Sequence, residues 1–181
     1  MFGRFVLVLS LCFVAPLAAQ AAPFVVTSPD FADDGLAPLS GAQPTCGGGT
    51  STSPALAWSG APPSTKSYVI LTVDVDNWGS IGTAAHWIAY GIPASVAAVP
   101  AGFGTQTAQY RSGLNAGNQP GFRGYCPTKG DAPHHYVFTV FATDLAPDAL
   151  ARDLTRDALI GALTGHTLAG SSVIARYAQP S

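Results

Sequence analysis

Residues 68–76 have the sequence Tyr-Val-Ile-Leu-Thr-Val-Asp-Val-Asp, and this stretch decides the fold class. Side chains of a β-strand alternate between two faces. One face of this segment therefore carries Val69, Leu71 and Val73. The other face carries Tyr68, Ile70, Thr72 and Asp74. Because both faces are apolar in the middle of the segment, we expect a central strand that is covered by other structure on both sides.

Similar short runs of β-forming residues follow one another along the chain, separated by clusters of Gly, Pro, Ser and Asn. This spacing is typical of a β-sandwich. The further strands are expected at residues 24–27, 55–58, 86–92 and 134–143, and residues 172–177 are expected to form a final strand or a packed tail. Between Pro100 and Pro120 we expect a long surface loop, because this stretch is rich in Gly, Asn and Gln and has no periodicity. Long loops of this kind are often functional.

A helical signal occurs only late in the sequence. Thr155 is a suitable N-cap for a short helix from Arg156 to about Leu163, and Gly165 follows its end. The apolar stripe of this helix is expected to consist of Leu159, Ile160 and Leu163. The elements together predict a mostly β protein whose helical structure is confined to the C-terminal part of the chain.

The composition agrees with one β-rich globular domain in a chain of 181 residues. Hydrophobic residues make up 48% and charged residues 10%, which is the opposite of the balance found in disordered chains. All acidic residues are Asp, a residue of turns and helix caps, so an all-helical protein is not expected. The formal net charge of -2 provides no basic surface for a nucleic acid.

The first 21 residues have the three parts of a secretory signal peptide. Arg4 precedes an apolar run at residues 5–17, and Ala19-Gln20-Ala21 gives a small-x-small cleavage pattern. The apolar run is shorter than the ~20 residues that a membrane-spanning helix needs. We therefore expect cleavage after Ala21, a mature domain at residues 22–181 without a membrane span, and a periplasmic or secreted location.

Cleavage at this point leaves Cys46 and Cys126 as the thiols of the mature chain. Disulfides persist in oxidising compartments, and two cysteines allow a single pairing. The alternative is a pair of separate buried thiols that pack as small hydrophobic groups. Because an exported protein enters an oxidising compartment, the disulfide is favoured.

Polar side chains occur at the ends of several predicted strands. The four of most interest are Asp74, His86, His134 and Tyr136. His134 and Tyr136 leave the same face of their strand, whereas His135 points the other way. Imidazole and phenol groups donate hydrogen bonds to anions, and a neighbouring carboxylate fixes the tautomer of an imidazole. The alternative at each position is a polar group that only completes the hydrogen bonding of its own strand end.

Motifs of metal sites and of common enzymes are absent from the sequence. The histidines do not have the spacing of metal ligands, and there is no Cys-x-x-Cys, no Gly-x-Ser-x-Gly and no phosphate-binding loop. The run Gly47-Gly48-Gly49 lacks the βαβ surroundings of a dinucleotide site. We therefore expect no metal ion, no cofactor and no catalytic residues.

The order of these residues resembles the phosphatidylethanolamine-binding proteins, in the bacterial Raf-kinase-inhibitor-like branch. The first block of that family is Asp-Pro-Asp-Ala-Pro followed by His-Trp; here residues 74–78 are Asp-Val-Asp-Asn-Trp, followed by His86-Trp87. The second block is Gly-x-Gly-Gly-Pro-Cys-Pro-Pro followed by His-Arg-Tyr. Here residues 121–128 are Gly-Phe-Arg-Gly-Tyr-Cys-Pro-Thr, and residues 134–136 are His-His-Tyr. The resemblance covers nearly all of the mature chain.

The resemblance implies a Greek-key antiparallel β-sandwich with one or two short C-terminal helices and one small pocket. In this chain the family's pocket corresponds to Asp74, His86, His134 and Tyr136, with Asp76, Tyr125 and Pro127 completing its wall. The implied ligand is a small anion such as phosphate or a phospholipid head group. The family's prolines are replaced by Val75, Trp78, Tyr125 and Thr128, so the shape of the loops is expected to differ, and Trp78 is placed to narrow or cover the pocket.

The sequence is compatible with three alternative functions. The first is an exported, non-enzymatic anion-binding protein, for which inhibition of a cytosolic kinase is not expected. The second is a hydrolase that uses Asp74, His86 and His134 as acid–base groups to activate water. The third is a secreted protein-interaction module, acting through Trp78 and the loop at residues 100–120, in which the pocket is vestigial.

Overall fold

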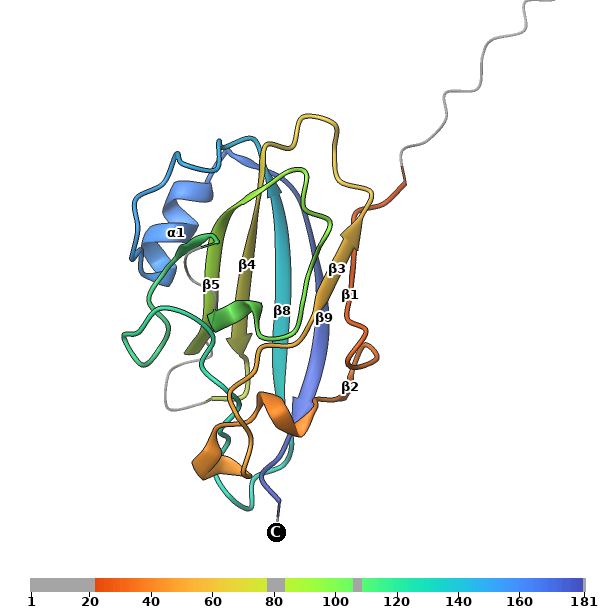
Figure 1. The fold of residues 1–181 in the computed structure, drawn as a ribbon, viewed down its shortest axis with the longest axis vertical. Coiled ribbons are helices and arrows are strands. Elements are labelled where there is room, and N and C mark those ends of the chain that lie inside the picture. The colour runs from red at the N-terminus through yellow and green to blue at the C-terminus, as the bar shows by residue number, and fades with distance from the viewer. Residues whose placement is uncertain (1–21, 78–83, 106–108, 181) are drawn as a thin grey trace, which may run out of the picture.

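The computed structural model describes residues 22–77, 84–105 and 109–180. The expected signal peptide and Trp78 therefore lie outside the described residues. The described chain forms two β-sheets with one α-helix (Figure 1). Its strands are β1 (Val25–Thr27), β2 (Gly35–Leu36), β3 (Leu56–Ser59), β4 (Ser67–Asp74), β5 (Ala84–Pro93), β6 (Ala98–Val99), β7 (Arg111–Ser112), β8 (His134–Thr143) and β9 (Thr167–Tyr177). The helix is α1 (Arg156–Leu163). The mostly β sandwich expected from the sequence is confirmed.

The larger sheet has the strand order β2-β9-β8-β4-β5-β7, and the smaller has the order β1-β3-β6. Strand β4 therefore lies between β5 and β8, as its sequence predicts. All pairings are antiparallel except that of β2 with β9, which is parallel. The position of β8 beside β4, rather than beside β5 or β7, is the kind of crossover that a Greek key produces.

The two faces of β4 belong to two different hydrophobic cores. Tyr68 and Ile70 pack into the core between the sheets, which also contains Trp58 of β3. Val69 and Leu71 pack on the opposite side of the sheet, against α1. A strand that is apolar on both faces is needed here because the smaller sheet covers one face and the helix covers the other.

Helix α1 begins and ends where the sequence predicts. The side-chain oxygen of Thr155 accepts a hydrogen bond from the N–H of Ala158 at 3.3 Å, which is the expected N-cap. Leu159 and Leu163 are buried, but Ile160 is 41% exposed, so its assignment to the apolar stripe was wrong. Leu159 and Leu163 lie one turn apart on the same face, and Ile160 points about 100° away from Leu159.

The segment between Pro100 and Pro120 is not the surface loop that the sequence predicts. Phe103 and Tyr110 are buried in the core between the sheets. The hydroxyl of Tyr110 donates to the carbonyl of Gly104 at 2.9 Å and accepts from the indole N–H of Trp87 at 3.2 Å. Phe103 begins the 3-10 helix η4 (Phe103–Thr105), and Tyr110 directly precedes β7, so no period of 2 or 3.6 marks them in the sequence. Residues 106–108 lie outside the described part.

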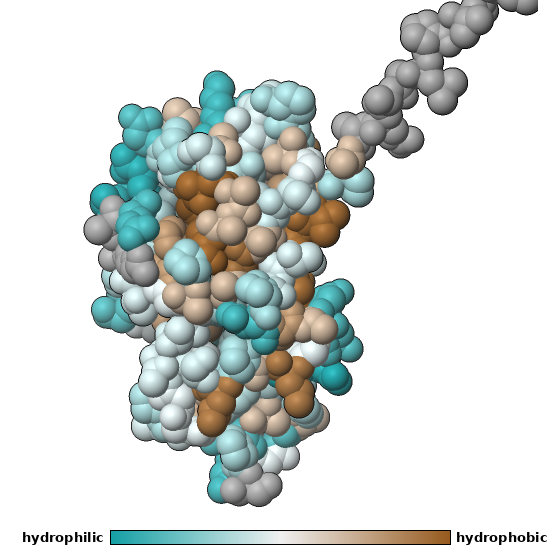
Figure 2. Space-filling view, turned by 45° about the vertical axis from the view of Figure 1, so that its right-hand side comes forward, coloured by the Kyte–Doolittle hydropathy of each residue, from teal (hydrophilic) through white to brown (hydrophobic). Residues whose placement is uncertain are grey.

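The surface of the molecule carries separate apolar areas. Figure 2 shows them divided by polar residues on the visible face. The large hydrophobic side chains that are most exposed among the described residues include Val25, Leu36 and Leu39. Scattered apolar groups of this kind are normal on soluble proteins. Among the described residues, no helix combines the length and the apolar character needed to cross a membrane.

The antiparallel pairing brings the predicted polar strand ends together at one end of the larger sheet. Asp74, at the end of β4, pairs with Tyr136 near the start of β8 and with Ala84 at the start of β5. His86 follows two residues after Ala84. The C-terminus lies at the same end of the molecule (Figure 1).

Candidate functional site

A cavity of about 200 Å³ lies at this end of the sheet. The described residues that line it are Gln43, Asp74, Asn77, Ala84, His86, Ala116, Arg123 and Cys126. Two of the predicted site residues, Asp74 and His86, therefore share one cavity. Strands β4 and β5 position them, and the segment at residues 115–126 provides the facing wall.

The side chain of Asp74 is only 3% exposed, and hydrogen bonds to neighbouring residues hold it in place. The ring nitrogen Nδ1 of His134 lies 2.9 Å from Oδ2, and the N–H of Asp76 donates to Oδ1 at 3.0 Å. His134 faces Asp74 because it lies two residues before Tyr136, the partner of Asp74 in the β4–β8 register. A buried carboxylate needs such partners because an uncompensated buried charge is costly.

His134 does not line the cavity that contains Asp74 and His86. It lines a second hollow of about 260 Å³, whose other described residues are Asp76, Asp131, Ala132 and Pro133. Its Nε2 lies 3.6 Å from a carboxylate oxygen of Asp131. The structure thus brings Asp74 and His134 into contact but places His86 and His134 in different hollows.

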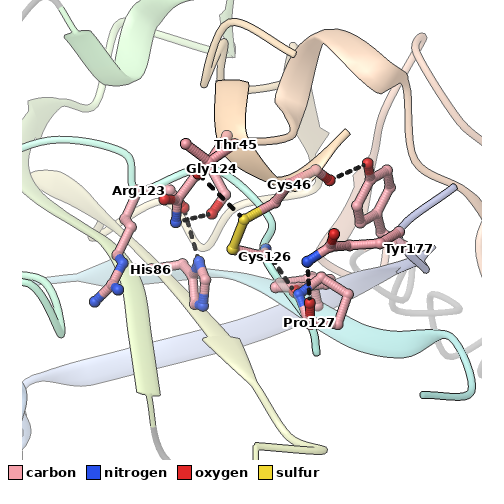
Figure 3. Close-up of a disulfide and its surroundings, with 11 residues drawn as sticks. Thr45, Cys46, His86, Arg123, Gly124, Cys126, Pro127 and Tyr177 are labelled. Atoms are coloured by element: carbon pink, nitrogen blue, oxygen red, sulfur yellow. Dashed lines mark hydrogen bonds between the residues drawn. A yellow bond between two sulfur atoms is a disulfide. The ribbon is translucent and has the colours of Figure 1, made fainter. Parts of the chain in front are cut away.

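His86 is fixed to the loop that contains Arg123. Its Nδ1 lies 2.7 Å from the carbonyl oxygen of Arg123, and the N–H of Arg123 donates to the carbonyl oxygen of His86 at 2.7 Å (Figure 3). Burial lowers the pKa of the His86 ring below its usual range; the hydrogen bond to Arg123 and the charge of Asp74 oppose this by smaller amounts. The ring is therefore neutral near pH 7.

Tyr136 packs against the ring of His86 and is not among the residues that line the cavity. The two rings meet edge to face with centroids 5.0 Å apart. The hydroxyl of Tyr136 accepts a hydrogen bond from the N–H of Cys126 at 3.3 Å. Burial, followed by the negative charge of Asp74, raises the pKa of this phenol, so it stays protonated at physiological pH.

The other predicted wall residues also lie away from the cavity. Tyr125 is fully buried, with its ring 4.5 Å from that of Tyr136, and its hydroxyl has no hydrogen-bond partner among the described residues. Pro127 is buried, and its carbonyl accepts from Gln179 at 2.7 Å. Asp76 lines the second hollow.

The carboxylate of Asp76 accepts from both the N–H and the ring Nδ1 of His135, each at 2.7 Å. Burial would raise the pKa of Asp76, but the hydrogen bonds and charge of His135 outweigh it and lower the pKa. His135 thus points away from Asp74, as the strand alternation predicts, and it anchors the chain that follows β4.

A disulfide joins Cys46 to Cys126, with their Cα atoms 5.1 Å apart (Figure 3). Cys46 ends the 3-10 helix η2 (Pro44–Cys46) and is buried, whereas Cys126 lines the cavity. Gln43 adds a hydrogen bond from its side-chain amide to the carbonyl of Gly124 at 3.1 Å. The disulfide and this bond hold the segment at residues 123–126 in place.

Three polar lining residues were not predicted from the sequence: Gln43, Asn77 and Arg123. Among the described lining residues, Arg123 carries a permanent positive charge. Its guanidinium forms no ion pair with a described residue. One signal was present: Arg123 stands where the second block of the resembled family has a glycine. Asn77 likewise stands where the first block has an alanine, whereas Gln43 lies outside both blocks and gave no such signal.

Comparisons with known proteins agree with the fold. A family model described as phosphatidylethanolamine-binding protein matches residues 27–178. The UPF0098 protein YbcL of Escherichia coli (strain K12) is 35% identical over 170 residues, which cover 86% of this chain and 85% of that protein. The "Putative lipoprotein LppC" of Mycobacterium tuberculosis is 34% identical over 130 residues, covering 71% of this chain and 60% of that protein.

Solved structures of proteins described as belonging to the same family are similar to this chain. The crystal structure of E. coli YbcL, described as a new member of the mammalian PEBP family, matches with a TM-score of 0.79 and 30% sequence identity. The match covers 88% of this chain and 100% of that chain. A structure from Chlamydia trachomatis, described as a homologue of the same family, has a TM-score of 0.76 at 26% identity, covering 87% and 99% of the two chains.

Proposed function

This chain belongs to the phosphatidylethanolamine-binding protein family, and on that premise we propose that it is an exported, non-enzymatic protein that binds a small anion. The ligand class is phosphate or a phosphate-bearing group such as a phospholipid head group. The binding site is the cavity lined by Asp74, His86 and Arg123.

The observation that carries the proposal is the position of Arg123. Its guanidinium lines a small cavity without an ion-pair partner among the described residues. Guanidinium groups bind phosphate and carboxylate oxygens with paired hydrogen bonds. The side-chain amides of Gln43 and Asn77 provide further donors. A volume of about 200 Å³ is below the range of drug-sized ligand sites, so it suits a single small group.

Binding rather than catalysis is proposed because the described lining residues offer no activated nucleophile. The sulfur of Cys126 is in the disulfide, and the hydroxyl of Tyr136 is buried and accepts from a backbone N–H. The Asp74–His134 pair is the one observation that favours a hydrolase, since a carboxylate orients the base in many hydrolases. However, His134 lines the second hollow, where its free nitrogen faces Asp131.

Export is supported by three features. The N-terminal sequence has the parts of a signal peptide, the chain contains a disulfide, and one relative is named as a lipoprotein. Disulfides are rare in reducing compartments of mesophiles. We therefore propose a periplasmic or secreted location.

The test is an NMR titration of the purified protein with inorganic phosphate, in which the imidazole signals of the four histidines are followed. We expect a saturable shift of the His86 signals and a much smaller shift for His166, which lies on the exposed turn after α1. Hydrolysis of phosphate esters that disappears in His86→Ala would favour the enzyme instead. No phosphate-dependent shift at His86 would overturn the proposal.

A further inference from the structure

The disulfide between Cys46 and Cys126 has one buried half and one accessible half. Cys46 is 4% exposed, whereas Cys126 is exposed and is one of the residues that line the cavity of about 200 Å³. Figure 3 shows the bond beside the ring of His86, which lines the same cavity. Exposed disulfides are reduced more readily than buried structural ones. The cavity therefore gives a small molecule a route to the sulfur of Cys126.

Thiol–disulfide exchange depends on which of the two sulfurs a thiolate can reach. The thiolate attacks one sulfur, and the other sulfur leaves with the electron pair of the broken bond. Here Cys126 is the accessible half and Cys46 is the leaving half. The sulfur of Cys46 lies 3.6 Å from the hydroxyl oxygen of Thr45, so this hydroxyl can donate a hydrogen bond to the departing thiolate.

The charges around the cavity favour an anionic thiol. Arg123 lines the cavity, and its guanidinium forms no ion pair with a described residue. The opposite charge in the cavity is that of Asp74, but this carboxylate is already engaged. It is hydrogen-bonded to the ring of His134, to the N–H of Asp76 and to the hydroxyl of Tyr136. The charge that remains without a partner is therefore positive.

Both ends of the disulfide have backbone hydrogen bonds that do not depend on the sulfur–sulfur bond. The carbonyl of Cys46 accepts from the hydroxyl of Tyr177 at 2.8 Å, and the N–H of Cys126 donates to the hydroxyl of Tyr136 at 3.3 Å. The side chain of Gln43 donates to the carbonyl of Gly124 at 3.1 Å. These bonds hold the two cysteines near each other after the disulfide opens, so Cys46 stays placed to close it again.

We propose that Cys126 is a site of reversible thiolation by a small anionic thiol that enters through the cavity. The thiolate attacks the sulfur of Cys126 and forms a mixed disulfide with it. The bond to Cys46 breaks, and the sulfur of Cys46 keeps the electron pair and takes up the proton that the incoming thiol lost. Attack by Cys46 on the mixed disulfide reverses the step. The attached group occupies the cavity, so thiolation excludes the small anion of the proposed function.

The experiment exposes the purified full chain to mercaptoethanesulfonate at about pH 8, where a thiol with an ordinary pKa of ~8.5 is partly ionised. Early samples are quenched with acid, free thiols are alkylated in denaturant, and peptide mass spectrometry locates each group. We expect the sulfonate adduct on Cys126 and the alkyl group on Cys46. An adduct mainly on Cys46, an intact disulfide, or full reduction without an adduct would overturn the inference.

A pair of variants tests the route through the cavity. Ala116→Phe places a large ring in the cavity, and we expect the disulfide to open at least about tenfold more slowly, because the thiolate loses its line of approach. The matched control is Ala132→Phe, which adds the same ring to the second hollow and should leave the rate unchanged. Both alanines are exposed, so neither change disturbs the core. Equal rates in the two variants would show that the thiol reaches the sulfur by another path and would overturn the inference.

A comparison of two thiols of similar size and opposite charge tests the ligand class. Per thiolate, mercaptoethanesulfonate should react faster than cysteamine, and Arg123→Gln should reduce this preference. Faster reaction of cysteamine in the wild type would overturn the assignment to an anionic thiol. The outcome is separate from that of the proposed function: a phosphate-dependent shift at His86 together with an unreactive disulfide would overturn this inference and leave anion binding standing.

Discussion

Nδ1 of His134 lies 2.9 Å from Oδ2 of Asp74, and this bond joins β8 to β4 at the end of the sheet that contains the candidate site. The side chains are 12% and 3% exposed, so the pair is largely shielded from water. The carboxylate lines the cavity while the imidazole lies outside it. His134 therefore holds in place the carboxylate that lines the cavity.

Replacement of His134 by alanine should destabilise the protein by about 2–4 kcal/mol, because it leaves a buried carboxylate without its main partner. Urea unfolding at pH 7 measures this change in the free energy of unfolding. The matched control is His166→Ala, which removes a similar bond of 2.8 Å between exposed groups and should cost about 0–1 kcal/mol. Equal costs for the two variants would contradict the structural role of His134.

The buried His86 ring should make stability depend on pH. Its pKa is lower in the folded protein than its ordinary value of 6.5, so the unfolded chain takes up this proton more readily. The free energy of unfolding should therefore fall as the pH drops below about 6.5, by at most ~1.4 kcal/mol per pH unit, until the folded ring is protonated. Asp74, Arg123 and Tyr136 are the charged or titratable groups acting on this ring.

The measurement is urea unfolding at several pH values between 7 and 5, for the wild type and for His86→Gln. The variant lacks the titrating ring, so its free energy of unfolding should depend less steeply on pH in this window. A His86→Gln protein with the wild-type slope would show that another group causes the dependence.

Much of the fold was predictable because its main elements repeat a regular pattern. Strand β8 and helix α1 have the predicted bounds, since alternation and an N-cap at Thr155 mark them. Phe103 and Tyr110 were not recognised as core residues, because a single 3-10 turn and a bend bring them inward and neither leaves a period in the sequence. Strand β9 begins at Thr167, earlier than predicted, where its residues are mostly exposed.

The candidate site was predictable only in part. The sequence singled out Asp74 and His86, which share a cavity, because polar residues at the ends of strands are conspicuous. It could not show that His134 faces a different hollow, because that depends on the bond to Asp74. Arg123 was missed although it replaces a glycine of the resembled family, because a charged residue in an irregular segment otherwise has the pattern of any solvent-exposed side chain.

Substitution of Arg123 by glutamine should weaken phosphate binding by about 10- to 100-fold, since one charged hydrogen-bonding group contributes roughly 1.5–3 kcal/mol. Stability should change little, because the side chain is exposed and has no ion-pair partner among the described residues. Isothermal titration calorimetry gives the affinity and urea unfolding gives the stability.

The control for this charge removal is Lys66→Gln. Lys66 is exposed and precedes β4, whereas Asp74 ends that strand, so the two ends lie about 25 Å apart. The control removes the same formal charge from a position far from the cavity. If both variants lost the same amount of affinity, the effect would come from net charge, and the specific role of Arg123 would be wrong.

Removal of the disulfide should lower both the stability and the affinity. The bond closes a loop between positions 80 residues apart, and the loop-entropy model gives roughly 4–5 kcal/mol for a loop of this length. It also fixes Cys126, whose N–H bonds to Tyr136 and whose neighbours carry the cavity wall. The double variant Cys46→Ala/Cys126→Ala should therefore unfold at lower urea concentration and bind phosphate more weakly where it is folded.

Dithiothreitol should produce the same changes in the wild type and none in the double variant. A double variant with wild-type affinity would show that the hydrogen bonds of Gln43 and Tyr136 suffice to hold the wall, and that the disulfide serves stability alone.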